Sequence, residues 1–296
     1  MFFQGMAGSG EAPPLRPVLF LRSLPVSRVF RGGRMDEVAQ QVLLEFVNRA
    51  RLQPAVEAER HGVVLPPGVL PVPPVAPSAF LADLARAHSQ AMAEHGLFGH
   101  QGRDGRGPLD RAVAAGFPVT GSWAFGEILS VRLLDGDDVP LADQHADLFR
   151  SPGHRQIMLS PDMREVGIGL AQGAWSFETG VGGPASFLTE TFAASGRAVF
   201  VTGVVFRDGN ADKAYDAGEG VGGIVVSFDG QETRTTEAGG YTLALTGPAQ
   251  GMMTLGAATL PLTVAAVNRK IDHDLTSGRV FVRDDGSYGE GGLPGR

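Results

Sequence analysis

Residues 151–159 read SPGHRQIML, and the fold assignment depends on this stretch. Its opening serine and proline are typical of a helix N-cap and first helical residue, which places His154 in the first turn. Two polar groups upstream, His100 and Glu127, each follow a glycine at the edge of an expected element. Imidazole and carboxylate groups suit a zinc-like cation or general acid/base chemistry. The sequence therefore indicates one cleft to which three distant segments contribute.

A second ion site is indicated by residues 208–219, DGNADKAYDAGE. Oxygen ligands recur there with the spacing of a calcium loop, at positions one, three, five, seven (a backbone carbonyl), nine and twelve: Asp208, Asn210, Asp212, Ala214, Asp216 and Glu219. Position six is Lys213, where an EF-hand has glycine, and strands are expected on both sides of the loop. The pattern predicts a calcium site outside the EF-hand fold, and a plain acidic turn is the alternative.

Composition limits the class of protein. The chain has 296 residues, 43% hydrophobic and 19% charged, which is typical of globular domains. A net charge of -7 without a basic run argues against nucleic acid as a partner. The absence of cysteine excludes disulfides and thiolate metal sites. No apolar run is long enough for a transmembrane segment.

The composition changes along the chain and indicates four parts. Residues 1–35 are expected to be poorly ordered leader or cloning-derived sequence, without a clear signal peptide. Residues 36–196 read as helices layered on a small sheet. Residues 197–285 read as a compact β-sandwich because short strand-like runs alternate with turn residues. Residues 286–296 are expected to be a flexible tail.

Helical periodicity and caps predict the main elements of the first domain, with a Pro-rich connection over 62–78. We expect helices over 36–51, 78–95, 108–115 and 141–149, a helical turn from 151, and strands over 166–171 and 186–192. In the second domain we expect strands over 201–206, 223–228, 240–245, 262–267 and 279–282.

Several of these segments together resemble the bacterial branch of the CAP superfamily, which comprises the cysteine-rich secretory, antigen 5 and pathogenesis-related class one proteins. The resemblance covers residues 36–194. It rests on NRAR at 48–51, FLADLARAHSQAMA at 80–93, FGH at 98–100, Arg111 with Gly116-Phe117, Gly126-Glu127, SPGHRQIML at 151–159 and VGIGL at 166–170.

This resemblance implies an α+β fold, an α-β-α sandwich whose cleft holds two histidines and two acidic residues around a divalent cation. Position by position, the histidines are His100 and His154, and the first acid is Glu127. Ser151 stands where the second acid is expected. Two more positions depart from the family pattern, Ile128 in place of asparagine and Leu148 in place of tryptophan.

The second domain is similar to the calcium-binding B-type repeats of bacterial surface adhesins, which are immunoglobulin-like or prealbumin-like sandwiches. The similarity rests on VTGVVFRDGN at 201–210, GEGVGGIVV at 218–226, Thr235-Thr236 and GGY at 239–241. It implies calcium at the acidic loop.

Other polar residues have structural interpretations. Glu127 could bond only to backbone amides, and His100 and His154 could have structural hydrogen bonds. His88 lies on an apolar helix face and is expected in the core, whereas His145 is expected to be solvated. Arg155 is expected to bridge to a nearby carboxylate or carbonyl.

Two functions follow. The first is a secreted or surface-associated bacterial protein whose cleft binds Zn²⁺ and a lipid, sterol or peptide, with a calcium-stiffened sandwich that contacts a cell-surface partner. The second is a metal-dependent peptidase or esterase using His100, Glu127 and His154. The chain has neither His-Glu-x-x-His nor Gly-x-Ser-x-Gly, so we favour binding at the cell surface or outside the cell.

Overall fold

A computed structural model describes residues 33–119, 121–134, 136 and 139–283. The expected tail at 286–296, and the expected leader up to residue 32, lie outside the described residues. The helices are α1 (Gly33–Leu52), α2 (Pro54–His61), α3 (Ala79–His95), α4 (Pro108–Ala114), α5 (Leu141–Arg150) and α6 (Pro152–Met158). Among the described residues, no helix has both the length and the apolar character needed to cross a membrane.

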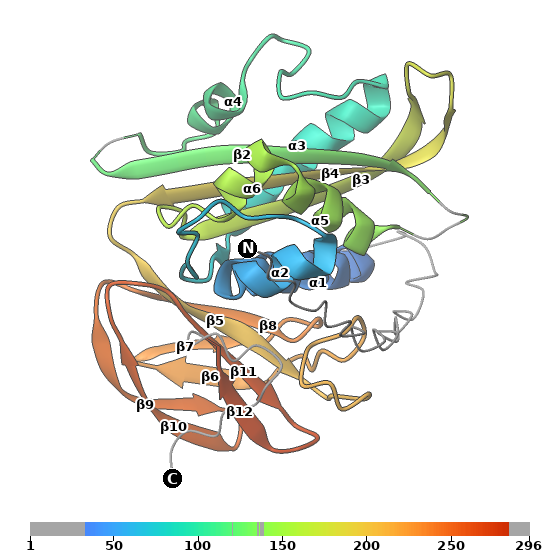
Figure 1. Ribbon diagram of the computed structural model, residues 1–296. Helices are drawn as coiled ribbons and strands as arrows, with labels where there is room; N and C mark the ends of the chain where they lie inside the picture. The colour runs from blue at the N-terminus through green and yellow to red at the C-terminus, as the bar shows by residue number, and fades with distance from the viewer. Residues whose placement is uncertain (1–32, 120, 135, 137–138, 284–296) are drawn as a thin grey trace, which may run out of the picture.

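The first sheet has the strand order β1-β3-β4-β2, with β1 (Ala76–Pro77), β2 (Trp123–Leu133), β3 (Glu165–Ser176) and β4 (Gly182–Ser195). The β1 strand is parallel to β3, and the other pairs are antiparallel. Helices cover both faces (Figure 1). The long edge strand β2 was not predicted, because Gly126-Glu127 interrupts its apolar alternation. Helix α2 was also missed, although Pro54 at its first turn is a start signal.

Glycines on β3 allow α3 to lie directly on the sheet. A Cβ atom at Gly167 would be 2.0 Å from the backbone of Leu81, and one at Gly169 would be 2.1 Å from the backbone nitrogen of Arg86. No side chain fits at these distances, so helix and strand backbones are in contact. The alternating glycines at 167 and 169 therefore fix where α3 sits, and with it the loop that carries His100.

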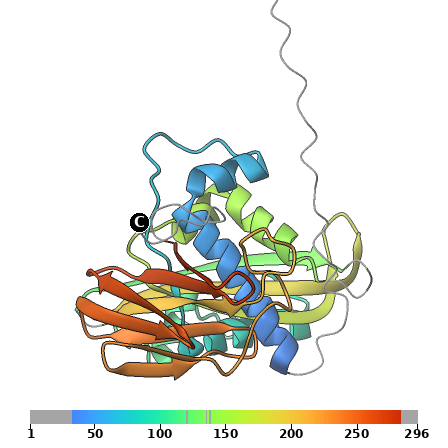
Figure 2. The same cartoon turned by 90° about the horizontal axis from the view of Figure 1, so that it is seen from below.

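Helix α1 lies between this sheet and the C-terminal strands (Figures 1 and 2). Leu43 and Val47 are fully buried in one apolar cluster. That cluster joins Ile168 of β3 to Phe206 and Phe281 of the C-terminal region. A helix covered on two sides buries residues around most of its circumference, and α1 buries polar Glu45, Asn48 and Arg51 beside its apolar residues.

Polar side chains of α1 anchor the Pro-rich connection. Asn48 donates to the carbonyl of Val75 over 3.0 Å and accepts from its amide over 2.8 Å. The fully buried Arg51 donates to the carbonyls of Pro73, Met158 and others, and burial lowers its pKa to about 9. The NRAR run thus holds the connection and the end of α6 against α1.

The C-terminal region contains two four-stranded sheets, consistent with a β-sandwich, in the orders β10-β9-β6-β7 and β12-β11-β5-β8. Their strands are β5 (Val199–Phe206), β6 (Val225–Phe228), β7 (Gln231–Arg234), β8 (Gly240–Leu245), β9 (Ala249–Leu255), β10 (Ala258–Val264), β11 (Arg269–Asp274) and β12 (Arg279–Val282). All pairs are antiparallel except β5 with β11. The strand predicted over 262–267 was wrong at its end, since β10 stops at Val264 and the chain then crosses to the other sheet.

A buried ion network joins the two regions. Lys270 on β11 lies 2.9 Å from Glu45 of α1 and also contacts Asp272. Asp272 in turn accepts a hydrogen bond of 2.9 Å from Arg283. All four side chains are almost completely buried. The two cations hold the pKa of Asp272 below its ordinary value, although burial opposes this.

The core beneath the first sheet also holds one carboxyl group with no visible partner. Glu190 of β4 is fully buried, and neither of its oxygens has a hydrogen-bond partner in the structure. Burial raises its pKa from 4.5 to about 8. The folded protein therefore keeps a proton on Glu190 at pH values where the unfolded chain has released it.

This buried acid predicts an unusual pH dependence. Between the unfolded pKa of 4.5 and the folded pKa of about 8, the free energy of unfolding should fall as pH rises. The slope should approach about 1.4 kcal/mol per pH unit for this group. Glu190→Gln, which is neutral and nearly isosteric, should remove this slope in urea unfolding, whereas the exposed Glu94→Gln should retain it. Identical slopes in all three proteins would contradict the assignment.

Candidate functional site

Two of the residues predicted for the cleft, His100 and Glu127, meet at β2, an edge strand of the first sheet. Glu127 is on β2 opposite Thr191 of β4, and its carboxylate approaches His88 of α3. His100 lies in the loop that follows α3, and His154 lies in the first turn of α6. Because β2 is an edge strand, the loop after α3 and helix α6 can approach each other past it.

Two of the predicted residues are in direct contact. His100 Nδ1 is 3.0 Å from Glu127 Oε1. Arg111 donates to Glu127 Oε2 and to the backbone carbonyl of His100, each over 2.6 Å. His88 donates to the Gly99 carbonyl over 2.9 Å and lies 3.8 Å from Glu127. Glu127 therefore bonds to side chains, and the interpretation in which it bonds only to backbone amides was wrong.

The contact also defines the chemistry of His100. A carboxylate accepts hydrogen bonds, so the proton lies on Nδ1, and in the neutral ring Nε2 then keeps a free lone pair. The His100 side chain is 46% exposed, while that of Glu127 is 4% exposed. The half-exposed His100 ring is thus held on its Nδ1 side by a nearly buried carboxylate.

Among the described residues, His154 makes no hydrogen bond or ion pair with His100 or Glu127, and only an electrostatic effect of His100 reaches it. It is partly buried, and burial together with the charge of His100 lowers its pKa. The ligand atoms of His100, Glu127 and His154 do not all lie within 4.8 Å of one another, judged over the described residues. The metal ligand set of these three residues stays a prediction.

The neighbouring positions are explained by the fold. Ile128 points away from Glu127 into the core, and Leu148 is also fully buried there, so neither departure removes a group from the cleft. His88 is buried, as predicted. Arg155 donates to the carbonyl of Phe149 over 2.6 Å, which confirms its bridging role.

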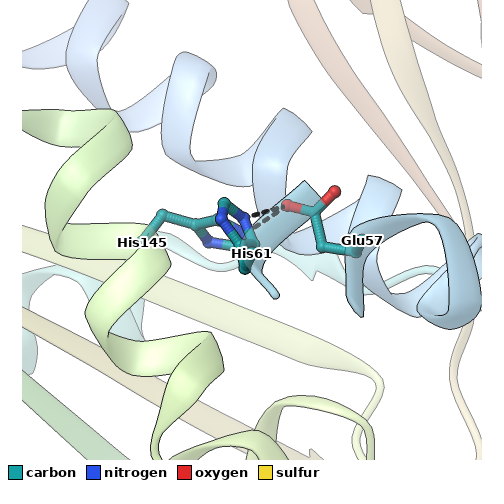
Figure 3. A group of neighbouring side chains, drawn as sticks. All are labelled: Glu57, His61 and His145. Carbon is teal, nitrogen blue, oxygen red and sulfur yellow. Dashed lines mark hydrogen bonds and ion pairs between the residues drawn. The ribbon is translucent and has the colours of Figure 1, made fainter. Parts of the chain in front are cut away.

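A second histidine and carboxylate group was missed. Glu57 Oε1 lies 2.9 Å from His61 Nε2 and 3.0 Å from His145 Nε2 (Figure 3). His145, expected to be solvated, is 1% exposed because α5 turns it toward α2. The spacing of Glu57 and His61, four residues apart in a helix, was the sequence signal for part of this group.

Arg49 completes the surroundings of Glu57, with bonds of 2.7 and 2.8 Å to the two carboxylate oxygens. Burial acts to raise the pKa of Glu57, but hydrogen bonds from Arg49, His145 and His61 hold it well below its ordinary value. Burial lowers the pKa of His145. Glu57 is thus an ionised carboxylate that contacts three side chains, those of Arg49, His61 and His145.

The acidic loop between β5 and β6 is held in shape by its own side chains. Asp208 accepts from the amides of Ala211 and Lys213, over 2.7 and 2.9 Å. Glu219 accepts from the amides of Gly209 and Asp216, over 2.7 and 2.9 Å. The first and last predicted ligands, Asp208 and Glu219, are therefore held in place by hydrogen bonds to backbone amides of the loop.

The middle of the loop concentrates negative charge. The Asn210 amide nitrogen lies 3.2 Å from Asp212 and 2.8 Å from Asp216. Burial raises the pKa of Asp216, and the charges of Asp212 and Asp208 raise it further. Lys213 at position six has φ 66°, the left-handed conformation that glycine usually supplies there.

Part of the chain matches a known protein family. Residues 44–180 match the family model described as CAP, the cysteine-rich secretory protein family. These residues form a CAP domain. No curated protein matches the chain.

Three bacterial proteins are among the solved structures that the chain matches. An extracellular protein with an SCP domain from Bacillus anthracis matches at 19% identity and TM-score 0.36, over 54% of this chain and 42% of that one. An outer surface protein from Borrelia burgdorferi matches at 13% identity and TM-score 0.35, over 56% of this chain and 97% of that one. A cysteine-rich secretory protein from Staphylococcus aureus matches at 16% identity and TM-score 0.31, over 56% of this chain and 41% of that one. The match thus spans less than half of the Bacillus and Staphylococcus chains.

The ion pair of Arg111 with Glu127 predicts that Arg111 stabilises the folded protein. Arg111→Gln leaves the nearly buried Glu127 without its ion pair and should lower the free energy of unfolding by roughly 2 kcal/mol. The control is Arg106→Gln, which removes an exposed pair with Asp104 and should cost less than about 1 kcal/mol. Urea unfolding measures both. Equal losses would show that Arg111 is an ordinary surface cation.

Proposed function

We propose that this is a secreted or surface-associated bacterial protein whose CAP cleft binds a divalent cation of the zinc class together with a small ligand. The observation that carries the proposal is the contact from His100 Nδ1 to Glu127, 3.0 Å long. Histidines that bind zinc usually donate their second ring nitrogen to a carboxylate in this way. His100 Nε2 and His154 would then hold the ion, with Glu127 beside them.

The role of Glu127 follows from its partners. Both of its oxygens already accept hydrogen bonds, one from His100 and one from Arg111. Such a carboxylate orients a ligand histidine better than it accepts a proton from water. This favours binding over the alternative of a metal-dependent hydrolase, in which Glu127 would act as general base.

Apolar groups beside the cleft support a ligand with an apolar part, such as a lipid, a sterol or a peptide. Leu97 and Phe98 directly precede the Gly99-His100 pair and are 47% and 40% exposed. Phe98 packs edge-on against Trp175 with ring centroids 6.0 Å apart. A ligand that bridges the cation and these side chains would remove apolar surface from water.

For the C-terminal region we propose a calcium-stiffened sandwich of the immunoglobulin-like or prealbumin-like type, related to adhesin B-type repeats. The support is the loop with Asp208, Asn210, Asp212, Asp216 and Glu219 at calcium-loop spacing, closed by its own hydrogen bonds, with Ala214 placed to offer its carbonyl. A bound ion would relieve the repulsion that raises the pKa of Asp216. The Asn210 amide would turn so that its oxygen faces the ion.

This module would act as a spacer or as the contact to a cell-surface partner. The buried pairing of Lys270 with Glu45 supports a spacer held firmly against the CAP domain.

The cleft site predicts zinc binding that depends on both histidines. In calorimetric titration of the full chain with Zn²⁺, His100→Ala and His154→Ala should each bind one Zn²⁺ ion fewer per chain than the wild type. Glu127→Gln should weaken the binding of that ion by about 10- to 100-fold, since it orients His100. The exposed His95→Ala should bind as the wild type does. Unchanged binding in both His100→Ala and His154→Ala would remove the cleft metal site.

The loop predicts that calcium stabilises the folded chain. Calcium at a hundredfold excess over its dissociation constant should add about 2.7 kcal/mol relative to chelator, seen as a higher thermal midpoint. Glu219→Gln, at the bidentate position, should abolish the gain, while the exposed Glu232→Gln should keep it. A wild-type midpoint that calcium does not move would leave the loop as an acidic turn.

A further inference from the structure

The second histidine and carboxylate group has the convergence of a metal site. One nitrogen each from His61 and His145 and one oxygen from Glu57 all lie within 4.8 Å of one another, and among the described residues no other such group of three occurs. Figure 3 shows both rings directed at the same carboxylate oxygen. The residues come from α2 and α5, on the sheet face opposite α3.

The spacing of these atoms is close to that of a coordination sphere. Zinc bonds of about 2.0 to 2.2 Å in a tetrahedral site place neighbouring ligand atoms roughly 3.3 Å apart. The two nitrogen-oxygen separations here are 2.9 and 3.0 Å. Small side-chain shifts would therefore admit an ion between the three groups without moving the helices.

The surroundings orient the ligands. Arg49 bonds to both oxygens of Glu57, through Nε to Oε2 at 2.7 Å and through Nη2 to Oε1 at 2.8 Å, and this fixes Oε1 where it also meets both histidines. The ring of Phe149 packs against His61 with centroids 5.7 Å apart, and the ring of Phe46 packs against His145 at 5.4 Å. The His145 side chain is 1% exposed and that of His61 is 10% exposed, so an ion would enter past His61. A hydrogen-bonded carboxylate is typical of metal sites, whereas the second ring nitrogen of His145, Nδ1, is buried without a hydrogen-bond partner in the structure.

The donor set also selects the class of ion. Two imidazole nitrogens and one carboxylate suit Zn²⁺, Ni²⁺ or Cu²⁺, whereas Ca²⁺ and Mg²⁺ require more oxygen ligands. Arg49 and Arg60, which is 3.5 Å from Glu57, partly neutralise the carboxylate. This further disfavours hard cations, whose binding depends on carboxylate charge. It also limits the affinity for any dication.

We propose that Glu57, His61 and His145 form a transition-metal site of the Zn²⁺ class, separate from the CAP cleft, that ties α2 to α5. The ion would replace the two histidine contacts with Glu57 by coordinate bonds. Because the three ligands converge only in the folded chain, the ion would stabilise the native state.

The test uses a chain in which the two histidines of the proposed cleft site have been replaced. The full chain with His100→Ala and His154→Ala is titrated with Zn²⁺ by calorimetry and with Co²⁺ by visible absorption, which reports nitrogen coordination. We expect one equivalent to bind, and the thermal midpoint to rise with Zn²⁺. Adding His61→Ala, at the accessible end of α2, should weaken this equivalent by at least about tenfold and abolish the rise. Adding the exposed His95→Ala instead should change neither.

Two results would overturn the proposal. The cleft-free chain could fail to bind either ion, or the His61→Ala chain could bind as tightly as its parent. In both cases Glu57 is only a hydrogen-bonded hub. Far-UV circular dichroism confirms folding of each variant, and Glu57 itself is left intact because its loss would unpair Arg49. The cleft proposal fails separately. It fails if replacing His100 and His154 in the wild-type chain does not lower the number of Zn²⁺ ions bound per chain.

Discussion

The structure depends on the burial of α1 between two β-layers. Lys270 lies between Glu45 of α1 and Asp272 of β11, with almost no contact with water. Removing one member of a buried ion network leaves an uncompensated charge and costs roughly 3 to 5 kcal/mol. The network therefore fixes how the C-terminal sheets meet the CAP domain, while the surrounding apolar cluster supplies the main driving force.

This junction extends to the acidic loop. Arg283, which bonds to Asp272, also donates to the Lys213 carbonyl inside the loop. Tyr215 of the same loop is buried in the cluster that contains α1, edge-on to Phe206. The conformation of the loop and the packing of the two regions are thus connected through Arg283 and Tyr215.

Both histidine groups of the CAP domain share one construction principle. In each, an arginine and imidazole nitrogens contact the same buried carboxylate: Arg111 and His100 at Glu127, and Arg49 with two histidines at Glu57. At Glu57, burial acts to raise the pKa, but the hydrogen bonds from Arg49 and the two histidines hold it well below its ordinary value. Glu190, fully buried with no visible partner, shows the contrast, because its pKa rises to about 8.

The sequence by itself determined what depends on short-range spacing. The periodicity of α1 and α3, the alternating glycines at 167 and 169, and the oxygen spacing of 208–219 are all local patterns. The family resemblance over residues 36–194 added His100, Glu127 and His154 as neighbours. The contact of the first two is present, because β2 presents Glu127 where the loop after α3 ends.

Only the tertiary structure decided which residues lose contact with water. His145 reads as a surface residue in its own helix, and α2 covers it. Glu45 and Lys270 are far apart in sequence, and neither carries a local sign of its partner. The physical reason is that periodicity records which face of an element is buried, whereas the partner of a polar group on that face depends on elements distant in the chain.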